Sequence, residues 1–167
     1  VTVLSTSNGW AKINYNGQTG YVSSSYLQST VPSGSTSNSG SNNSVSASAS
    51  SVIAYAKTLL GKPYVWGAQG PNSFDCSGFT SYVYKRYGVS LSRTAAGQYS
   101  NGVAVSKGEL QPGDLVMFGK SGINHVGIYI GGGKMIHAAN PSRGVTTDTI
   151  NSGYYGTNYV GARRILQ

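Results

Sequence analysis

Residues 74–89 read FDCSGFTSYVYKRYGV and contain the chain's only cysteine, Cys76. Cys76, Phe79 and Val83 recur at helical spacing. Gly88 then follows as a residue suited to end a helix. The stretch therefore predicts a helix that begins beside the cysteine. A lone cysteine is most often a small hydrophobic core residue, so its surroundings have to show whether Cys76 is a nucleophile.

Segments on both sides of this helix predict the rest of the folded domain. The stretch 51–64, SVIAYAKTLLGKPY, predicts a helix that ends at Gly61. We expect its buried face to consist of Ile53, Ala56, Leu59 and Leu60. A short third helix is expected near 95–100, and strands are expected at 115–118, 125–130, 135–139, 145–149 and 160–165. Helices followed by an antiparallel sheet indicate an α+β domain.

Residues 1–28 show a separate pattern of short strands. Two β-prone runs flank the turn Asn16-Gly17, which is a strong hairpin signal. The segment is too small to bury a core alone. Its stretch GWAKINYNGQTGYV resembles the C-terminal half of a bacterial SH3-like module. We therefore interpret 1–28 as a partial, all-β SH3-like remnant whose first half is supplied elsewhere or has been removed.

Residues 29–51 consist almost entirely of Ser, Gly, Asn, Thr and Ala and carry no charge. Such a stretch cannot bury enough apolar area to offset its ordering entropy, so we expect a flexible linker to a folded domain at 52–167. No run of about 18 apolar residues is present, so membrane insertion is not expected. The first residues lack the features of a signal peptide, which for an exported protein indicates a mature or trimmed form.

The charge balance is strongly basic, with 12 Lys and Arg against four acids and a net charge of +8. Such an excess favours a polyanionic partner, either nucleic acid, an anionic membrane surface or an acidic cell-wall polymer. The basic residues are scattered, which favours diffuse adhesion to wall polymers over nucleic-acid recognition. A surface that only maintains solubility explains the charge equally well.

Cys76 and two histidines form the candidate chemistry. A thiol at a helix N-terminus is expected to have a lowered pKa, because the helix dipole favours an anion there. His125 and His137, the only histidines, fall on two expected strands joined by a Gly-rich turn. With a bulge in that hairpin they become near-direct cross-strand neighbours, so one imidazole can act on the thiol while the other orients it. For either histidine alone a structural explanation is the better one, with His125 starting a strand and His137 an ordinary half-buried residue, but one cysteine at a helix start with both histidines on one hairpin favours catalysis.

The order of these motifs resembles a known family. YVWGAQGPNSFDCSGF, PGDLVMF, HVGIYIGGGKMIHAA and YVGARRI follow one another as in the NlpC-type, papain-like cysteine peptidases of bacterial cell walls. The resemblance covers 52–167 and implies helices packed on an antiparallel sheet. It implies that Cys76 is the nucleophile, His125 the general base and acid, and His137 the orienting residue. Asn140 is a competing third member, since some papain-like enzymes use Asn.

The resemblance also implies substrate contacts around the nucleophile. Tyr64 matches a tyrosine that assists the oxyanion site, and Asp75 and Ser77 match residues that contact the substrate's amino end. Each has a structural alternative, since Tyr64 can simply pack and Asp75 can cap the helix. Arg93 is expected either to clamp a substrate carboxylate or to pair with an acid. Trp66 is interpreted as packing or a cleft wall.

The implied function is hydrolysis of the peptidoglycan stem peptide at the D-γ-glutamyl–diamino acid bond, through a thioacyl-enzyme. An amidase or acyltransferase on the same scaffold is an alternative, as is a wall-binding protein without catalysis. We expect no cofactor or metal, no nucleic-acid partner and a monomer. The expected location is secreted or associated with the cell wall of a Gram-positive bacterium.

Overall fold

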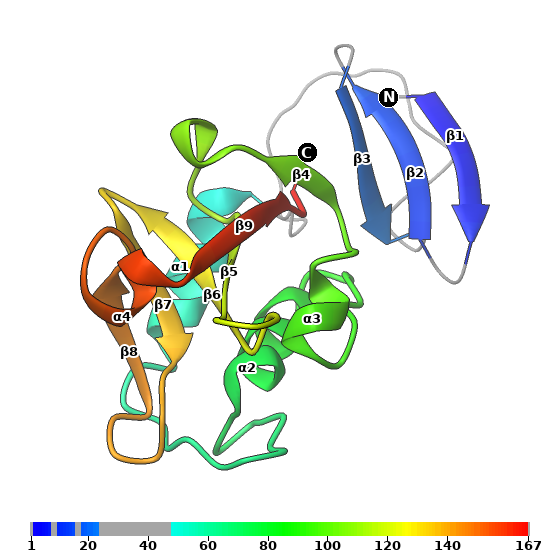
Figure 1. Cartoon of the computed structure of the whole chain (residues 1–167). Coiled ribbons are helices and arrows are strands. Elements are labelled where there is room, and N and C mark those ends of the chain that lie inside the picture. Colours follow the sequence, from blue (N-terminus) through cyan, green and yellow to red (C-terminus); the bar gives the residue numbers. More distant parts are fainter. Residues whose placement is uncertain (1, 8–9, 16–17, 24–47, 167) are drawn as a thin grey trace.

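The computed structural model describes residues 2–7, 10–15, 18–23 and 48–166. The larger part is a six-stranded antiparallel sheet in the order β4-β9-β5-β6-β7-β8 (Figure 1). Its strands are β4 (Val103–Val105), β5 (Leu115–Phe118), β6 (His125–Gly131), β7 (Lys134–Ala138), β8 (Val145–Thr149) and β9 (Tyr159–Arg164). The predicted α+β class with an antiparallel sheet is confirmed.

Helices precede the sheet and connect its strands. They are α1 (Ala49–Lys57), α2 (Cys76–Lys85), α3 (Ala95–Gln98), the 3-10 helix η2 (Lys107–Glu109) and α4 (Gly153–Thr157). Helix α2 packs on β6 and β7, and α1 packs on α2. The elements β4, η2 and α4 were not predicted from the sequence. These elements are three to five residues long, too short for a hydrophobic period to stand out.

Alternating side chains divide the sheet between two apolar clusters. Val126 and Ile128 of β6 and Ile136 of β7 belong to the cluster that contains the buried face of α2. Met135 faces the other way, into a second cluster partly covered by Tyr155 of α4. This alternation follows from the two-residue period of a strand. Residues of β6 and β7 that are not under α2 therefore point toward α4.

Helix α1 differs from its predicted bounds at both ends. It begins at Ala49, so residues 49–51, which we had assigned to the linker, belong to a helix. It ends at Lys57, and the chain turns through Gly61, which has a φ of 88°. Because the helix has ended, Leu60 no longer follows the buried face. Leu59 is buried, but Leu60 is 46% exposed, so its predicted core position is wrong.

The N-terminal segment forms a three-stranded antiparallel sheet. Its strands are β1 (Thr2–Ser7), β2 (Trp10–Tyr15) and β3 (Gln18–Ser23), in the order β1-β2-β3. The predicted pairing of 10–15 with the following run is confirmed, while the turn Asn16-Gly17 and linker residues 29–47 lie outside the described residues. Within the described residues, no helix is both long and apolar enough to cross a membrane.

Candidate active site

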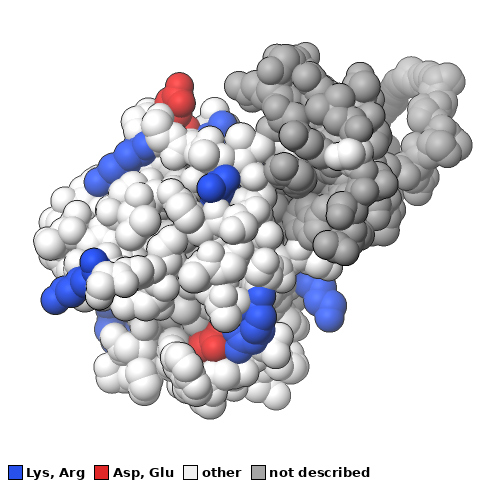
Figure 2. Space-filling model, turned by 45° about the vertical axis from the view of Figure 1, so that its right-hand side comes forward, with Lys and Arg blue, Asp and Glu red and all other residues white. Residues whose placement is uncertain are grey.

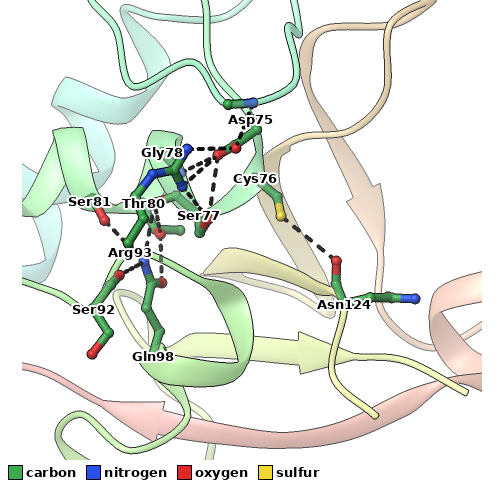
Figure 3. Close-up of polar contacts among 11 residues, drawn as sticks. Asp75, Cys76, Ser77, Gly78, Thr80, Ser81, Ser92, Arg93, Gln98 and Asn124 are labelled. Atoms are coloured by element: carbon green, nitrogen blue, oxygen red, sulfur yellow. Dashed lines mark hydrogen bonds and ion pairs between the residues drawn. The ribbon is translucent and has the colours of Figure 1, made fainter. Parts of the chain in front are cut away.

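Cys76 is the first residue of α2, and Asp75 caps that helix by accepting a hydrogen bond from the Gly78 N–H at 2.7 Å. The cysteine is 8% exposed. Figure 3 shows its side chain directed toward Asn124, whose backbone carbonyl accepts from the Cys76 Sγ–H at 3.9 Å. Asn124 immediately precedes His125. The thiol is therefore held at the beginning of the strand that carries the candidate base.

Burial raises the pKa of the Cys76 thiol, and the Asp75 carboxylate adds to that effect. Backbone N–H groups of Val126, Ser77 and Cys76 itself act in the opposite direction. Desolvation therefore outweighs the helix terminus, and the expected lowering of the thiol pKa is wrong for the unliganded protein. The thiol of Cys76 is therefore neutral at physiological pH in the unliganded protein.

The two histidines meet through their ring nitrogens. Nε2 of His125 lies 2.7 Å from Nδ1 of His137, and the rings are nearly perpendicular. His125 is 8% exposed and His137 is fully buried. This contact occupies Nε2 of His125, so Nδ1 is the ring nitrogen of His125 that does not face His137.

The strand register explains how the histidines reach one another. Strands β6 and β7 pair Ile128 with Ile136, and one further step places Gly127 opposite His137. His125 is therefore a diagonal neighbour of His137, which corrects the expected near-direct pairing. The expected irregularity does occur, between Tyr129 and Gly131. A Cβ on Gly127 would lie 3.1 Å from the Cβ of His137, so the glycine leaves room for the diagonal contact.

Asp148 of β8 extends this row to a third strand. Its Oδ2 lies 2.7 Å from Nε2 of His137, and Arg143 donates to both carboxylate oxygens at 2.8 and 3.1 Å. Burial alone would raise the pKa of Asp148, but hydrogen bonds from Arg143 and His137 hold it below its usual value. Asp148 was not among the site residues predicted from the sequence. The alternation of 145–149 was the available signal, since it places this acid on one face of an expected strand.

Burial also determines the protonation of the imidazoles. Desolvation, together with His137, lowers the pKa of His125 to about 3, against a smaller opposing effect of Asp148. Desolvation lowers the pKa of His137 as well, although Asp148 opposes it. Both rings lie about 5 Å from the ring of Tyr155, which covers them from α4. The two imidazoles are therefore neutral at physiological pH.

A second polar network surrounds Asp75. The Arg93 guanidinium donates to Oδ1 at 3.2 Å and to Oδ2 at 2.8 Å, and also to the Ser77 hydroxyl at 2.9 Å. The Gly67 N–H donates to Oδ2 at 3.0 Å. Of the two expectations for Arg93, the structure shows the pair with an acid. Burial would raise the pKa of Asp75, but Arg93 and the N–H groups of Gly78 and Gly67 hold it below its usual value.

Gln98 fixes the segment that carries Arg93 (Figure 3). Its side chain is fully buried and donates to the carbonyl oxygens of Ser77 and Ser92 and to the Ser81 hydroxyl. Its Oε1 accepts from the Thr80 hydroxyl at 2.7 Å. The 92–98 segment is thereby held against α2.

These groups line a cleft of about 510 Å³. Its wall includes Cys76, Tyr64, Asp75, Ser77 and Arg93, so all the expected substrate-contacting residues meet there. The pKa of the Tyr64 phenol is raised, first by burial and then by the charges of Cys76 and Asp75.

Trp66 also lines the cleft and is 86% exposed, which agrees with a wall position and not with packing. Asn140, the competing third member, instead organises a turn, because its Oδ1 accepts from the N–H groups of Ser142 and Arg143. Across the described part of the chain, no group of three or more His, Cys, Asp or Glu side chains is arranged to hold a metal ion.

A cysteine at the start of a helix, whose thiol lies at the beginning of the strand that carries a histidine pair, is the arrangement of a papain-like cysteine peptidase. Comparison with known proteins agrees with this class. The family model of the NlpC/P60 family matches residues 61–164, and that of the bacterial SH3 domain matches residues 1–28. The chain belongs to the NlpC/P60 family.

Two curated relatives represent the sequence similarity. The chain is 53% identical over 129 residues to the "Probable endopeptidase p60" of Listeria grayi, covering 77% of this chain and 25% of that protein. It is 43% identical over 122 residues to the "Gamma-D-glutamyl-L-lysine dipeptidyl-peptidase" of Bacillus cereus, covering 71% of this chain and 37% of that protein. The chain thus spans well under half the length of these relatives.

Solved structures show the same fold. A crystal structure of an NlpC/P60 family protein from Bacillus cereus has a TM-score of 0.71 and 32% identity, covering 99% of this chain and 53% of that one. The NlpC/p60 domain of the peptidoglycan hydrolase SagA has a TM-score of 0.63 and 35% identity, covering 70% of this chain and 97% of that one.

Proposed function

We propose that this protein is a peptidoglycan endopeptidase that cleaves the bond between D-γ-glutamate and the following diamino acid. The observation that carries the proposal is Cys76 at a helix N-terminus, in a cleft, with its thiol at the start of the strand that carries the His125–His137 pair. The relative described as a gamma-D-glutamyl-L-lysine dipeptidyl-peptidase supports the choice of bond.

Acylation begins from the neutral thiol. His125 accepts the Sγ proton while Sγ attacks the γ-glutamyl carbonyl, so the C–S bond forms as the imidazole becomes protonated. The imidazolium then gives that proton to the departing amine of the diamino acid, and the C–N bond breaks. The lowered pKa of His125 makes its conjugate acid strong, which favours this second transfer.

In the hydrolysis of the thioacyl-enzyme, His125 acts first as a base toward water and then as an acid toward sulfur. His125 takes a proton from water, whose oxygen attacks the acyl carbon, and the C–S bond breaks. The proton returns to sulfur and restores the neutral pair. In both steps the carbonyl oxygen carries negative charge, and we assign its stabilisation to the Cys76 backbone N–H and the Tyr64 hydroxyl.

Asp75 and Ser77 are proposed to receive the amino end of the stem peptide. Both lie in the cleft wall next to the nucleophile. Asp75 is ionised, so it supplies a negative charge for a substrate ammonium group. Arg93 already occupies both carboxylate oxygens, so its proposed role is to hold Asp75 in place and not to bind a substrate carboxylate.

The basic charge is proposed to retain the enzyme on anionic wall polymers outside the cell. Within 48–166, Arg93, Arg143 and Arg164 are ion-paired, and the lysines make no ion pair there. Figure 2 shows basic side chains spread over the visible face and not gathered into one patch. We expect a monomer whose adhesion to wall weakens as salt rises.

Muropeptide analysis tests the proposed bond. Purified walls with lysine and with diaminopimelate stems are incubated with the protein, with Cys76→Ser and with Ser90→Ala, a control at an exposed serine outside the cleft. A new free amine on the diamino acid, lost only in Cys76→Ser, is expected. Release of the lactyl-linked L-alanine end would instead assign an amidase, and undiminished lysis by a folded Cys76→Ser would rule out the proposal.

A further inference from the structure

The contact between Asp148 and His137 determines more than the position of one ring. His125, His137 and Asp148 lie on three adjacent strands, and their polar atoms form a row with two spacings of 2.7 Å. His137, in the middle, is fully buried. A buried imidazole with partners on both nitrogens has its tautomer set by what those partners can accept or donate.

Asp148 determines which ring nitrogen of His137 carries the proton. An ionised carboxylate only accepts hydrogen bonds, so Nε2 of His137 carries the proton and donates it to Oδ2. Asp148 is ionised because Arg143 and His137 hold its pKa below the usual value against the effect of burial. The pKa of His137 is lowered by burial, so its other nitrogen, Nδ1, has no proton and accepts.

The proton position on His137 in turn determines the proton position on His125. Because Nδ1 of His137 accepts, Nε2 of His125 must donate across the 2.7 Å contact. His125 is neutral, so its Nδ1 then carries a lone pair. The lone pair therefore lies on the nitrogen of His125 that does not face His137, which is the nitrogen that the proposed function uses as the base.

We propose that Asp148 is a positioning residue that keeps Nδ1 of His125 unprotonated, acting through His137 and without touching the substrate. The proposal deepens the proposed function and rests on it for its kinetic consequence. The tautomer itself is a property of the folded protein and is measured without substrate.

Arg143 makes the identity of residue 148 decisive. It donates to both oxygens of Asp148 from the outer side of the carboxylate. In Asp148→Asn, Arg143 retains the single remaining side-chain oxygen, and the amide nitrogen turns toward His137. That amide donates to Nε2, so His137 donates from Nδ1 and His125 accepts at Nε2. The proton of His125 then moves to Nδ1, the wrong nitrogen for a base.

The groups that face the two imidazoles are few. His125 meets His137, Tyr155 and the Phe118 ring, and the charge of Asp148 acts on it. His137 meets Tyr155 as well, and the charges of Asp148 and Arg143 act on it. The pKa of Tyr155 is raised to about 12, so this phenol stays neutral. Among these neighbours, Asp148 is the anion that fixes the proton positions.

The test is ¹⁵N NMR of histidine-labelled protein near neutral pH. In the wild type, Nδ1 of both rings is expected to show the shift of an unprotonated nitrogen and Nε2 that of a protonated one. In Asp148→Asn, both rings are expected to switch. Asp148→Glu, which restores an accepting carboxylate, is expected to return the wild-type pattern. A wild-type His125 protonated at Nδ1 overturns the proposal, whether or not any variant folds.

Kinetics on muropeptides give the second readout. Asp148→Asn is expected to lower kcat by on the order of 10- to 100-fold with little change in KM, by analogy with metal-binding histidines that lose their outer hydrogen-bond partner. Arg143→Gln removes the ion pair, but the carboxylate of Asp148 still accepts from His137, which also lowers its pKa, so the tautomer is kept and kcat stays within about threefold. An unswitched tautomer with unchanged kcat in folded Asp148→Asn overturns the proposal. Lysis by Cys76→Ser would overturn the proposed function but leave the tautomer measurement standing.

Discussion

Arg93 holds Asp75 through both terminal nitrogens of its guanidinium, at 3.2 and 2.8 Å. Asp75 directly precedes Cys76 and caps the helix that Cys76 begins. Its carboxylate also accepts from the Gly78 and Gly67 N–H groups, so three residues from different parts of the chain fix its orientation. An ion pair between residues 18 apart in sequence thus holds the carboxylate that caps the helix of Cys76.

Replacement of Arg93 by alanine is expected to destabilise the protein. The carboxylate keeps its backbone partners but loses its counter-charge, and the Arg93 side chain is 38% exposed. Solvent screening therefore limits the loss in unfolding free energy to about 1 kcal/mol. Urea unfolding measures it, with the exposed Lys57→Ala as the control for removing one positive charge.

The loss from Arg93→Ala should depend on pH in a defined direction. The folded-state pKa of Asp75 is depressed, so its stabilisation is present above the unfolded pKa of about 3.9 and disappears as pH falls through the folded value. The two proteins should therefore differ near neutral pH and converge at strongly acidic pH. A difference that grows on acidification would contradict the ion pair.

Alkylation of Cys76 by iodoacetamide should be slow at neutral pH in the unliganded protein. Burial raises the thiol pKa, so the thiolate fraction increases only as pH rises above the ordinary value of 9.0. The rate is measured across pH in native protein and in urea, where the thiol titrates normally. A fast alkylation rate that does not change with pH below neutrality would show that Cys76 and His125 form a thiolate–imidazolium pair and not a neutral pair.

The elements that carry strong local patterns could be predicted from sequence. The helix starting at Cys76 has regularly spaced apolar residues, the N-cap Asp75 and Gly88 just after its end. Each of these signals involves residues close together in sequence, so it can be recognised without the fold. The strands at 115–118 and 145–149 likewise matched their bounds, because alternation and turns are local signals. The candidate site residues were predicted from these elements together with the resemblance of their motifs to a known family.

Features that depend on strand register could not be predicted. Asp148 reaches His137 only because β8 pairs Thr146 with His137 and so places the acid two positions along the same face. No property of the sequence from 145 to 149 specifies that register. The thiol pKa was mispredicted for a similar reason, since burial of Cys76 comes from packing between α2 and β6 and not from its position in the helix.

Substitution of Gly127 by alanine is expected to disturb the histidine pair. The new Cβ would lie 3.1 Å from His137 Cβ and 2.6 Å from Sδ of the buried Met135. Overpacking of this kind costs about 1–3 kcal/mol and shifts the neighbours. Unfolding free energy and kcat should both fall, while Gly108→Ala, whose Cβ meets nothing within 4 Å, should change neither. Unchanged kcat in Gly127→Ala would show that His137 tolerates displacement.

Removal of the Tyr155 ring is expected to shift the acid limb of activity upward. Tyr155 covers both imidazoles, and burial is the main cause of the lowered His125 pKa. In Tyr155→Ala, water reaches the rings and the His125 pKa rises toward its ordinary value of 6.5. The protonated ring is no base, so kcat/KM should fall at mildly acidic pH where the wild type remains active. The control is Tyr154→Ala, at the half-exposed neighbouring residue on α4, which should keep the wild-type dependence of kcat/KM on pH. If Tyr155→Ala shows the same pH dependence as the wild type, groups other than Tyr155 exclude water from His125.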